Sequence, residues 1–340
     1  MMFSSNYFRL VWVTCFSLFL AACSSSGDSA SSSDISLRFS DAPVDDVSSV
    51  VITVDQIIFN RAGDSADIIV ESFTSDELGI EDEDTFTIDL LDVQGNDNRL
   101  VLDSVMLPVG EYQNMRLVIL DEDINESYVD DNDGRKNIKV PSDQLKLGAF
   151  TVGDRSAQTF VVEFGLRQAM TYNPGPDRYI LKPRGVRVVR LENASTVAGT
   201  VDLAAIHILE GCSDKVDASV GNVAYLYAEH NLDVSLLGDV FIREDDDQED
   251  PEVDEDVAAN IIAPTVATAI DGGTGDFLFS YLNTGDYTLA ISCKAENDDP
   301  VIYDGIDIPL PDAQLVELTL AAEVDLQCDF PVAGDCIIIE

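Results

Sequence analysis

The chain has 340 residues, and its 64 acidic residues far outnumber its 19 basic ones, which gives a formal net charge of −45 at pH 7. A surface this negative repels phosphate backbones and anionic lipid head groups, so the composition excludes nucleic acid as an expected partner. The acidity indicates solubility in salty surroundings first and an affinity for divalent cations second.

Residues 1–22 resemble a bacterial lipoprotein signal peptide. Met1 to Arg9 carries one basic side chain and no acidic one, and the apolar run from Leu10 to Leu20 is too short to span a bilayer. The run ends in Leu20-Ala21-Ala22-Cys23, which resembles a lipobox. Cys23 is therefore the expected lipidation site, and an ordinary signal peptide with a chance cysteine is the alternative.

Residues 23–34 follow as a lipidated cysteine with a serine-rich tether. Ser24 after the cysteine resembles the sorting pattern for the bacterial outer membrane. A diacyl thioether and an amide-linked third chain would anchor the protein without a transmembrane helix. The expected location is thus the outer membrane, on either its periplasmic or its cell-surface face.

From residue 35 onward, apolar and polar residues alternate with a period of two, which predicts short strands with one buried face. The predicted strands are 35–39, 50–54, 85–90, 114–120, 159–164 and 185–190, and after a pause at 191–194 they are 197–201, 223–228, 277–279, 287–291 and 315–320. Helical periodicity is scarce. We therefore expect an all-β fold, with two antiparallel β-sandwich domains in series at 35–191 and 195–322 and a cysteine-containing tail at 323–340.

Two acidic motifs in the first domain are candidate ligand sites. Asp41 and Asp45 flank Pro43 and are expected to accept hydrogen bonds from the local backbone, with ligand binding as the alternative. Further along, four aspartates at the ends of predicted strands form a candidate calcium site, namely Asp121, Asp123, Asp131 and Asp133. The register does not fit an EF-hand, because Gly134 at the sixth position would put Val129 at the first ligand. A solvated hairpin tip is the favoured reading, and no other cofactor is expected.

In the second domain, the acidic run at 243–256 cannot bury its charge and is expected to form a loop. Four cysteines remain after export, and an even number in an oxidising compartment indicates disulfides. Cys328 and Cys336 enclose a short loop, which favours a local pair and leaves Cys212 with Cys293. A zinc site is the rival, but the spacing lacks CxxC pairs.

Ordered motifs across residues 35–190 resemble the lipoprotein family of domain of unknown function 4382. They are Asp41-Ala42-Pro43-Val44-Asp45, Val140-Pro141-Ser142, Leu145-Lys146-Leu147, Phe150-Thr151-Val152, Phe160 to Phe164 and Tyr179-Ile180-Leu181-Lys182-Pro183. Val162 to Arg167 departs from the pattern, because it lacks an aspartate after the aromatic residue. The second domain resembles a carboxypeptidase regulatory-like or prealbumin-like module through Gly199-Thr200-Val201, Tyr225-Leu226-Tyr227 and Gly275 to Leu289. Neither resemblance implies a reaction.

The sequence favours a binding or assembly role at the cell envelope over catalysis. It contains no GxSxG, HExxH or glycine-rich phosphate motif, and its only histidines are His207 and His230. The expected partners are the membrane, through the lipid anchor, and an envelope protein or glycan. An aromatic binding face could be formed by Tyr225, Tyr227, His230 and Tyr281, but tyrosines at alternating strand positions are more typical of the core and its rim. A calcium-stiffened spacer and a carboxylate-based glycoside hydrolase are the alternatives.

Overall fold

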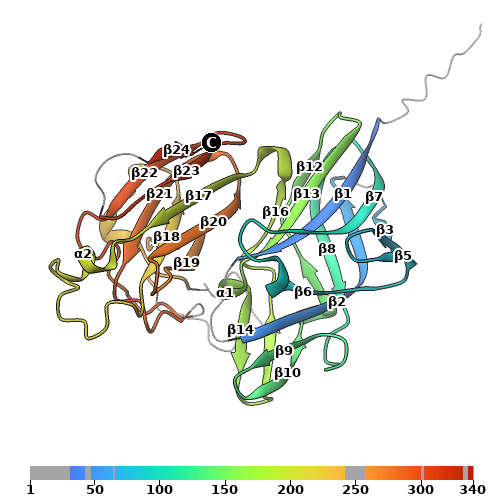
Figure 1. The fold of residues 1–340 in the computed structure, drawn as a ribbon. Coiled ribbons are helices and arrows are strands. Elements are labelled where there is room, and N and C mark those ends of the chain that lie inside the picture. The colour runs from blue at the N-terminus through green and yellow to red at the C-terminus, as the bar shows by residue number, and fades with distance from the viewer. Residues whose placement is uncertain are drawn as a thin grey trace, which may run out of the picture. The chain divides into compact units, whose positions relative to one another are not determined.

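The computed structural model describes residues 31–42, 47–63, 66–241, 257–299, 302–331 and 336–339. Ser31–Glu340 forms one compact unit (Figure 1). The predicted signal peptide, Cys23, Asp45 and the acidic run at 243–256 lie outside the described residues. Within the described part of the chain, no helix has the length and apolar character needed to cross a membrane.

The first half of the unit contains two large sheets and a small one. One sheet has the order β16-β13-β1-β7, built from β1 (Ser32–Asp41), β7 (Arg99–Pro108), β13 (Ala157–Phe164) and β16 (Val186–Arg190). The ten-stranded sheet contains β2 (Val47–Arg61), β3 (Ile68–Val70), β6 (Phe86–Asp89), β8 (Gly110–Ile119), β9 (Tyr128–Asp131), β10 (Gly134–Lys139), β11 (Gln144–Lys146), β12 (Phe150–Val152), β14 (Met170–Asn173) and β15 (Arg178–Leu181). β4 (Phe73–Ser75) pairs with β5 (Ile80–Glu83).

Alternation of side chains explains how these strands form a core. In β1, Ile35, Leu37 and Phe39 are fully buried, whereas the intervening residues are partly exposed. Residues from both large sheets join one hydrophobic cluster, so the core lies between the sheets. Aromatic rings fill part of it, with Phe39 in edge contact with Phe86 at a centroid distance of 5.6 Å.

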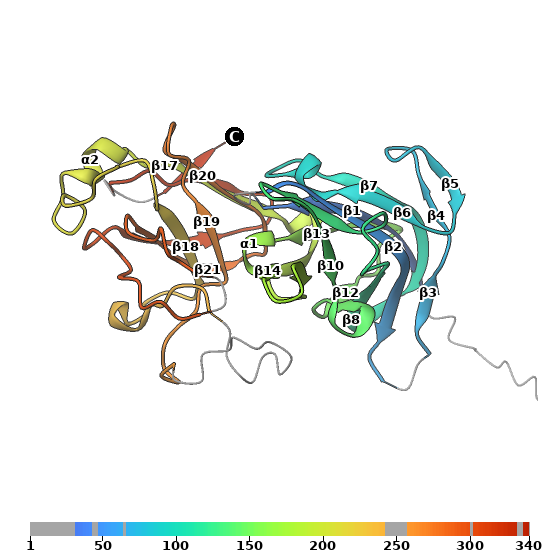
Figure 2. The same ribbon diagram turned by 90° about the horizontal axis from the view of Figure 1, so that it is seen from below.

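The second half contains two four-stranded sheets (Figure 2). The first has the order β20-β17-β23-β24, with β17 (Ser195–Thr200), β20 (Asp276–Leu282), β23 (Asp325–Gln327) and β24 (Ile337–Ile339). The second has the order β19-β18-β21-β22, with β18 (Val223–Ala228), β19 (Val266–Ala269), β21 (Gly285–Ser292) and β22 (Leu315–Leu320). A separate hydrophobic cluster draws residues from both of these sheets. The α-helices are short, α1 (Leu166–Ala169) in the first half and α2 (Leu203–His207) in the second.

Each predicted strand overlaps an observed one, but the structure also has strands that were not predicted, such as β7, β9 and β10, and the expectation of purely antiparallel sheets is wrong. β1 pairs in parallel with β13, β10 with β15, and β17 with β23. The period-two pattern records which face of a strand is buried and carries no information about the direction of its neighbour. A long stretch of chain, β2 to β12, separates β1 from β13, so β13 can run in either direction beside β1.

The second half differs from the prediction at its end. Residues 323–340 were expected to be a tail, yet β23 and β24 from this segment extend the sheet of β17. The pause at 191–194 coincides with a 3-10 helix at Leu191–Asn193, just before β17 begins. The two-domain boundary itself stays a prediction, because Ser31–Glu340 is one compact unit.

Candidate functional site

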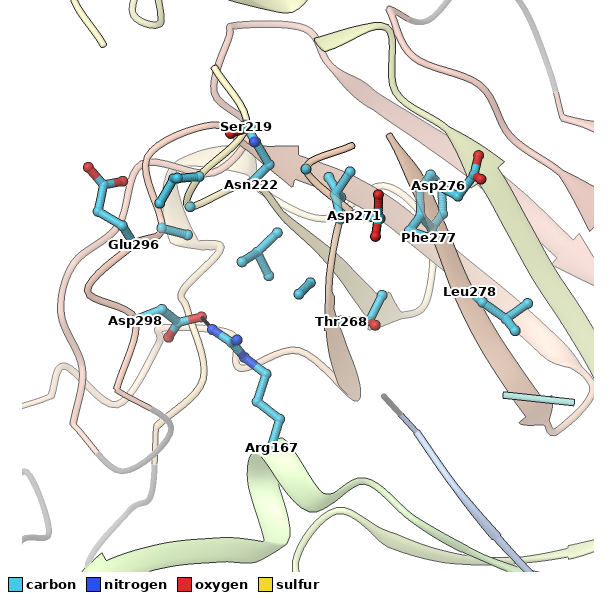
Figure 3. A pocket seen from close by; sticks show the side chains of 17 residues that line it. Arg167, Ser219, Asn222, Thr268, Asp271, Asp276, Phe277, Leu278, Glu296 and Asp298 are labelled. Atoms are coloured by element: carbon cyan, nitrogen blue, oxygen red, sulfur yellow. Dashed lines mark hydrogen bonds and ion pairs between the residues drawn. The ribbon is translucent and has the colours of Figure 1, made fainter. Parts of the chain in front are cut away.

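A groove of about 780 Å³ lies mostly in the second half of the unit (Figure 3). Its lining comes from four segments, which are Ser219–Val223, Thr268–Gly272, Asp276–Leu278 and Ala295–Asp298 without Asn297, together with Arg167 from α1. We call this hollow the groove. Thr268–Ala269 belong to β19 and Asp276–Leu278 to β20, which are the end strands of the two sheets. The groove therefore opens where the two sheets present unpaired edges.

A tight turn carries one wall of the groove. Asp271 Oδ1 accepts hydrogen bonds from the backbone of Gly273 and Thr274 at 2.8 and 2.7 Å and from the Thr274 hydroxyl at 3.0 Å. These donors hold the pKa of Asp271 below its usual range, so the side chain stays ionised. At the neighbouring Gly272, a Cβ would lie 2.3 Å from the carbonyl oxygen of Ser219. Only glycine allows the two walls to approach this closely.

The opposite wall is held by a disulfide and a partly buried ammonium group. Cys212 and Cys293 are bonded, and both are buried. Lys215 Nζ donates to the Cys293 carbonyl oxygen at 2.5 Å and to Asn222 Oδ1 at 3.2 Å, and burial lowers its pKa. The Ala295 amide donates to the Gly221 carbonyl oxygen at 2.8 Å. The segments around Gly221 and Ala295 are therefore pinned to each other.

Asp298 forms a buried ion pair at the base of the groove. Arg167 Nη2 lies 3.1 Å from Asp298 Oδ2, which also accepts from the Tyr225 hydroxyl at 2.8 Å. The Asp298 side chain is 0% exposed, and its Oδ1 has no hydrogen-bond partner in the described structure. Burial raises the pKa of Asp298, and the Arg167 charge opposes that rise.

A second buried carboxyl group lies behind Asp298. Asp239 Oδ2 accepts from the Ile306 amide at 2.9 Å, and burial raises the pKa of Asp239 to about 7. The negative charge of Asp298 contributes to this rise. Nearby, the Tyr227 hydroxyl donates to the Gly238 carbonyl oxygen at 2.7 Å. The repulsion between two buried carboxyl groups is smaller when one of them is protonated, so the pair favours binding of a proton.

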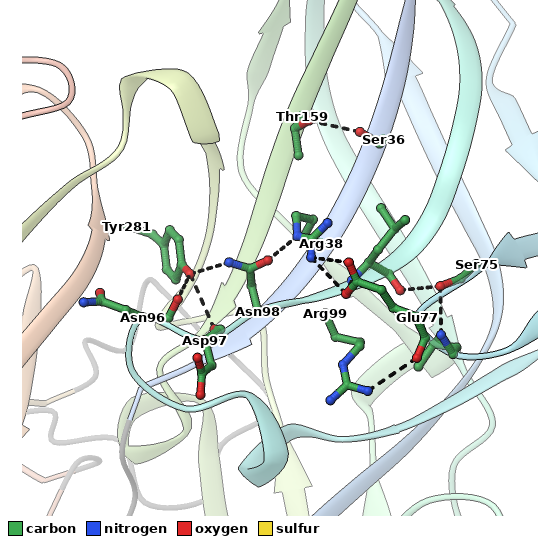
Figure 4. A network of polar contacts seen from close by, with 12 residues as sticks. Ser36, Arg38, Ser75, Glu77, Asn96, Asp97, Asn98, Arg99, Thr159 and Tyr281 are labelled. Atoms are coloured by element: carbon green, nitrogen blue, oxygen red, sulfur yellow. Dashed lines mark hydrogen bonds and ion pairs between the residues drawn. The ribbon is translucent and has the colours of Figure 1, made fainter.

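A separate polar network joins residues of the two halves around Tyr281 (Figure 4). Arg38 binds both carboxylate oxygens of Glu77, at 2.7 and 2.9 Å, and donates through Nε to Asn98. Asn98 donates to the Tyr281 hydroxyl at 2.7 Å, and that hydroxyl donates to the Asn96 carbonyl oxygen at 2.6 Å. The network thus ties Asn96 and Asn98 of the first half to β20 of the second half.

The structure places Asp41 in the core of the fold. It is 0% exposed at the end of β1, and its Oδ2 accepts from Gln94 Nε2 at 3.2 Å. Burial raises the pKa of Asp41 to about 8, against the effect of the Gln94 donor. Asp41 is not among the residues that line the groove. Besides Gln94, the backbone of Leu166 lowers its pKa by hydrogen bonding, so its donors come from distant segments and not from the local backbone that the sequence predicts.

The structure does not bring the predicted calcium ligands together. Asp121 accepts from the Val140 amide at 2.7 Å and pairs with Lys139 at 3.1 Å, and Asp123 accepts from the Asn125 amide at 2.9 Å. Asp131 accepts from the Asp133 amide and the Tyr179 hydroxyl, at 2.8 and 3.1 Å, in the hairpin of β9 and β10. Among the described residues, no group of three or more His, Cys, Asp or Glu side chains is placed to hold a metal ion.

The disulfide pairs are confirmed, and so is the favoured core position of the tyrosines, which excludes the alternative of an aromatic binding face for them. Cys212 pairs with Cys293, and Cys328 pairs with Cys336. Tyr225 and Tyr227 are fully buried and Tyr281 nearly so, because each supplies its ring to a core and its hydroxyl to a buried bond.

Sequence reasoning also missed the groove. Arg167 and Asp298 had no distinguishing signal, since 64 acidic residues give many equivalent candidates.

Residues 32–183 match the model of a protein family described as domain of unknown function DUF4382. This part of the chain therefore carries that domain, and the predicted resemblance over 35–190 is confirmed. A further β-rich region follows it toward the C-terminus. No curated protein sequence matches the chain.

Several solved structures are distantly similar. The Bacillus anthracis TIE protein is 12% identical, with 90% of this chain and 34% of that chain covered and a TM-score of 0.18. A minor pilin of Streptococcus agalactiae is 11% identical, with 90% and 96% covered and a TM-score of 0.18. A candidate cell adhesion protein from Bacteroides eggerthii is 8% identical, with 89% and 87% covered and a TM-score of 0.19. This chain spans about a third of the Bacillus protein. TM-scores this low support no inference about function.

Proposed function

We propose that this chain is a lipid-anchored protein of the bacterial outer membrane that binds an envelope protein or glycan without transforming it. The observation that carries the proposal is the groove. It is open, its walls are fixed by the Cys212–Cys293 disulfide and by close backbone contacts at Gly272, and it has polar groups on several sides. A concave site that is already formed in the free protein is typical of ligand binding.

The chemistry of the groove favours binding over hydrolysis. A carboxylate-based glycosidase needs a protonated acid in contact with the leaving group. Asp298 has the raised pKa that such an acid requires, but its side chain is 0% exposed and is held by Arg167 and Tyr225. Asp271 is held ionised by the donors of its turn. Neither can deliver a proton to a bound sugar from its present position.

The architecture of the second half supports the finer proposal of two β-sandwich domains. Its two four-stranded sheets share one hydrophobic cluster, as in a carboxypeptidase regulatory-like or prealbumin-like module. Such a module serves as an accessory binding domain or spacer. A binding groove at the edges of its sheets fits that use.

Thermal melting with a panel of peptides and oligosaccharides tests the binding proposal. A ligand that binds only the folded state raises the melting temperature. We expect at least one member of the panel to raise it, and mass spectrometry to recover that ligand unchanged. A cleaved ligand, with product that accumulates over time, would show that the protein is an enzyme.

Cell fractionation tests the proposed anchor. The variant Cys23→Ser lacks the sulfur that would take the diacylglycerol, so we expect the protein to move from the outer-membrane fraction to the soluble fraction. Cys15→Ser is the matched control, because that cysteine lies inside the predicted signal peptide. Retention of the Cys23→Ser protein in the membrane would contradict lipid anchoring at this residue.

A further inference from the structure

The backbone at the edges of the groove is directed toward it. The Ile270 amide donates to the Asn222 carbonyl oxygen at 2.9 Å, and Ala269 pairs with Val223. Ile270 and Asn222 therefore form a hydrogen-bonded pair. Because hydrogen-bonded and non-hydrogen-bonded pairs alternate along antiparallel strands, the next pair, Ala269 with Val223, is not hydrogen-bonded, and the N–H and C=O groups of Ala269 point away from β18. The same reasoning applies to β20. The Val201 amide donates to the Gly275 carbonyl oxygen, so this pair is hydrogen-bonded, and the alternation makes Leu278 with Ala198 a non-hydrogen-bonded pair. The backbone N–H and C=O groups of Leu278 therefore point away from β17. Both Ala269 and Leu278 line the groove.

The charge of the groove is strongly one-sided. Four acidic residues line it, Asp271, Asp276, Glu296 and Asp298, against one basic residue, Arg167, so the formal balance is 1 − 4 = −3. Asp276 and Glu296 are exposed. A cationic ligand is therefore attracted both by the groove and by the net charge of the whole chain, whereas an anionic one is repelled.

Asp298 already pairs with a guanidinium group of this chain. Arg167 extends from α1, in the first half of the unit, and its guanidinium pairs with Asp298 Oδ2 at the base of the groove (Figure 3). The other oxygen, Oδ1, is buried and without a hydrogen-bond partner in the described structure. Because this oxygen is buried, Asp298 adds negative charge to the base of the groove without touching a ligand.

Apolar side chains complete the groove. Val220, Val223 and Leu278 line it beside the carboxylates. Lysine and arginine place apolar stems along such surfaces while their charged ends reach the acids. The Phe277 ring is buried, so the groove offers no exposed aromatic platform for a sugar.

We propose that the groove binds an extended peptide segment that carries lysine or arginine side chains. The segment adds its backbone to the edge of β19 at Ala269, and its cationic side chains contact the exposed carboxylates of Glu296 and Asp276. This assignment rests on the proposed binding function and names its ligand class. It makes the partner a basic segment of another envelope protein.

Isothermal titration calorimetry of the purified chain with a capped seven-residue peptide of alternating Lys and Thr tests the assignment. Two peptides serve as controls, one with Glu in place of Lys and one with Pro in place of Thr, which keeps the charge but removes backbone donors. We expect the Lys-Thr peptide to bind, the Glu-Thr peptide not to bind, and the Lys-Pro peptide to bind more weakly.

Matched protein variants separate the groove from general charge attraction. Asp276→Asn with Glu296→Gln removes two exposed acids from the groove, and Glu81→Gln with Asp103→Asn removes two exposed acids of the same types elsewhere. We expect the first pair to weaken binding of the Lys-Thr peptide roughly five- to tenfold, and the second less than twofold. Far-UV circular dichroism checks that both variants remain folded.

Three results would overturn the assignment. Equal weakening by both variant pairs would show that the peptide binds the net charge and not the groove. Absence of Lys-Thr binding at low salt, while a neutral oligosaccharide binds and is lost in the groove variant, would keep the binding function and reject the peptide. If neither probe binds, the assignment fails together with the groove as a binding site.

Discussion

The two disulfides close loops of very different length, so their removal should cost very different amounts of stability. Cys212 and Cys293 are 81 residues apart, and Cys328 and Cys336 are 8 apart. The loop-entropy relation for an unfolded chain gives about 4.5 kcal/mol for the long loop and about 2.5 kcal/mol for the short one. Replacing each pair by alanine should therefore separate the two variants by about 2 kcal/mol in the free energy of unfolding.

The long-loop disulfide also has a local role at the groove. The carbonyl oxygen of Cys293 accepts from Lys215, whose pKa is lowered by burial, so loss of the bond frees a segment that holds a partly buried ammonium. We expect the Cys212→Ala/Cys293→Ala variant to lose amide-exchange protection around Gly221 and Ala295. The Cys328→Ala/Cys336→Ala variant should keep that protection, because its bond lies in another part of the second half.

Urea unfolding followed by far-UV circular dichroism measures both effects on stability. Tryptophan fluorescence is unsuitable, because the only tryptophan is Trp12, in the predicted signal peptide. Both variants remove two buried or half-buried sulfurs, so the side-chain contribution is similar and the difference reports mainly on loop length. Equal losses, or a larger loss for the short loop, would refute the entropic argument.

Three further predictions concern single residues. The raised pKa of Asp41 means that the folded state binds a proton more tightly than the unfolded state, so this residue stabilises the fold at low pH and the contribution is lost as pH rises from about 4 through about 8. Melting temperatures of the wild type and Asp41→Asn at pH 5, 7 and 9 should thus diverge in favour of the variant as pH rises, and the opposite trend would contradict the assignment. Arg167→Ala leaves Asp298 buried without its cation and should cost about 2 to 4 kcal/mol at pH 8 in urea unfolding. The loss should be smaller at pH 5, because burial raises the pKa of Asp298 and favours its uncharged form as pH falls; an equal loss at both pH values would show that packing and not charge is responsible. Gly221→Ala places a Cβ 2.6 Å from Glu296 at a backbone φ of +66°, and should lower stability by about 1 to 3 kcal/mol, whereas Gly134→Ala, with φ of +114° but open space around it, should cost only the backbone strain.

The sequence predicted where the strands lie because alternation of apolar side chains is a local property. Ile35, Leu37 and Phe39 alternate in β1 as expected, and all three enter the core. The direction of neighbouring strands depends on long connections, which leave no local pattern, so the parallel pairing of β1 with β13 was not predictable. The disulfides were predictable because few cysteines leave few pairings.

The groove could not be predicted because it arises from edges that meet only in the folded chain. Ser219–Val223, Thr268–Gly272 and Ala295–Asp298 are far apart in sequence, and each alone is typical of a loop or a strand end. The sequence left a binding face open as an alternative for the tyrosines for a related reason. Alternation cannot distinguish a ring on a core face from a ring on a ligand-binding face, and in Tyr225 and Tyr227 the core face was the correct one.

Buried acids also explain why the two predicted domains form one compact unit. Glu163 and Asp298 are buried beside arginines of the first half, Arg187 at 2.7 Å and Arg167 at 3.1 Å. Arg187 also donates to the Ser280 carbonyl oxygen, on β20 of the second half, at 3.0 Å. Separation of the halves would therefore break the pair that Arg167 makes with Asp298 and the bond that Arg187 makes with β20. A chain with 64 acidic and 19 basic residues has few cations for such pairs, and it uses two of them where its halves meet.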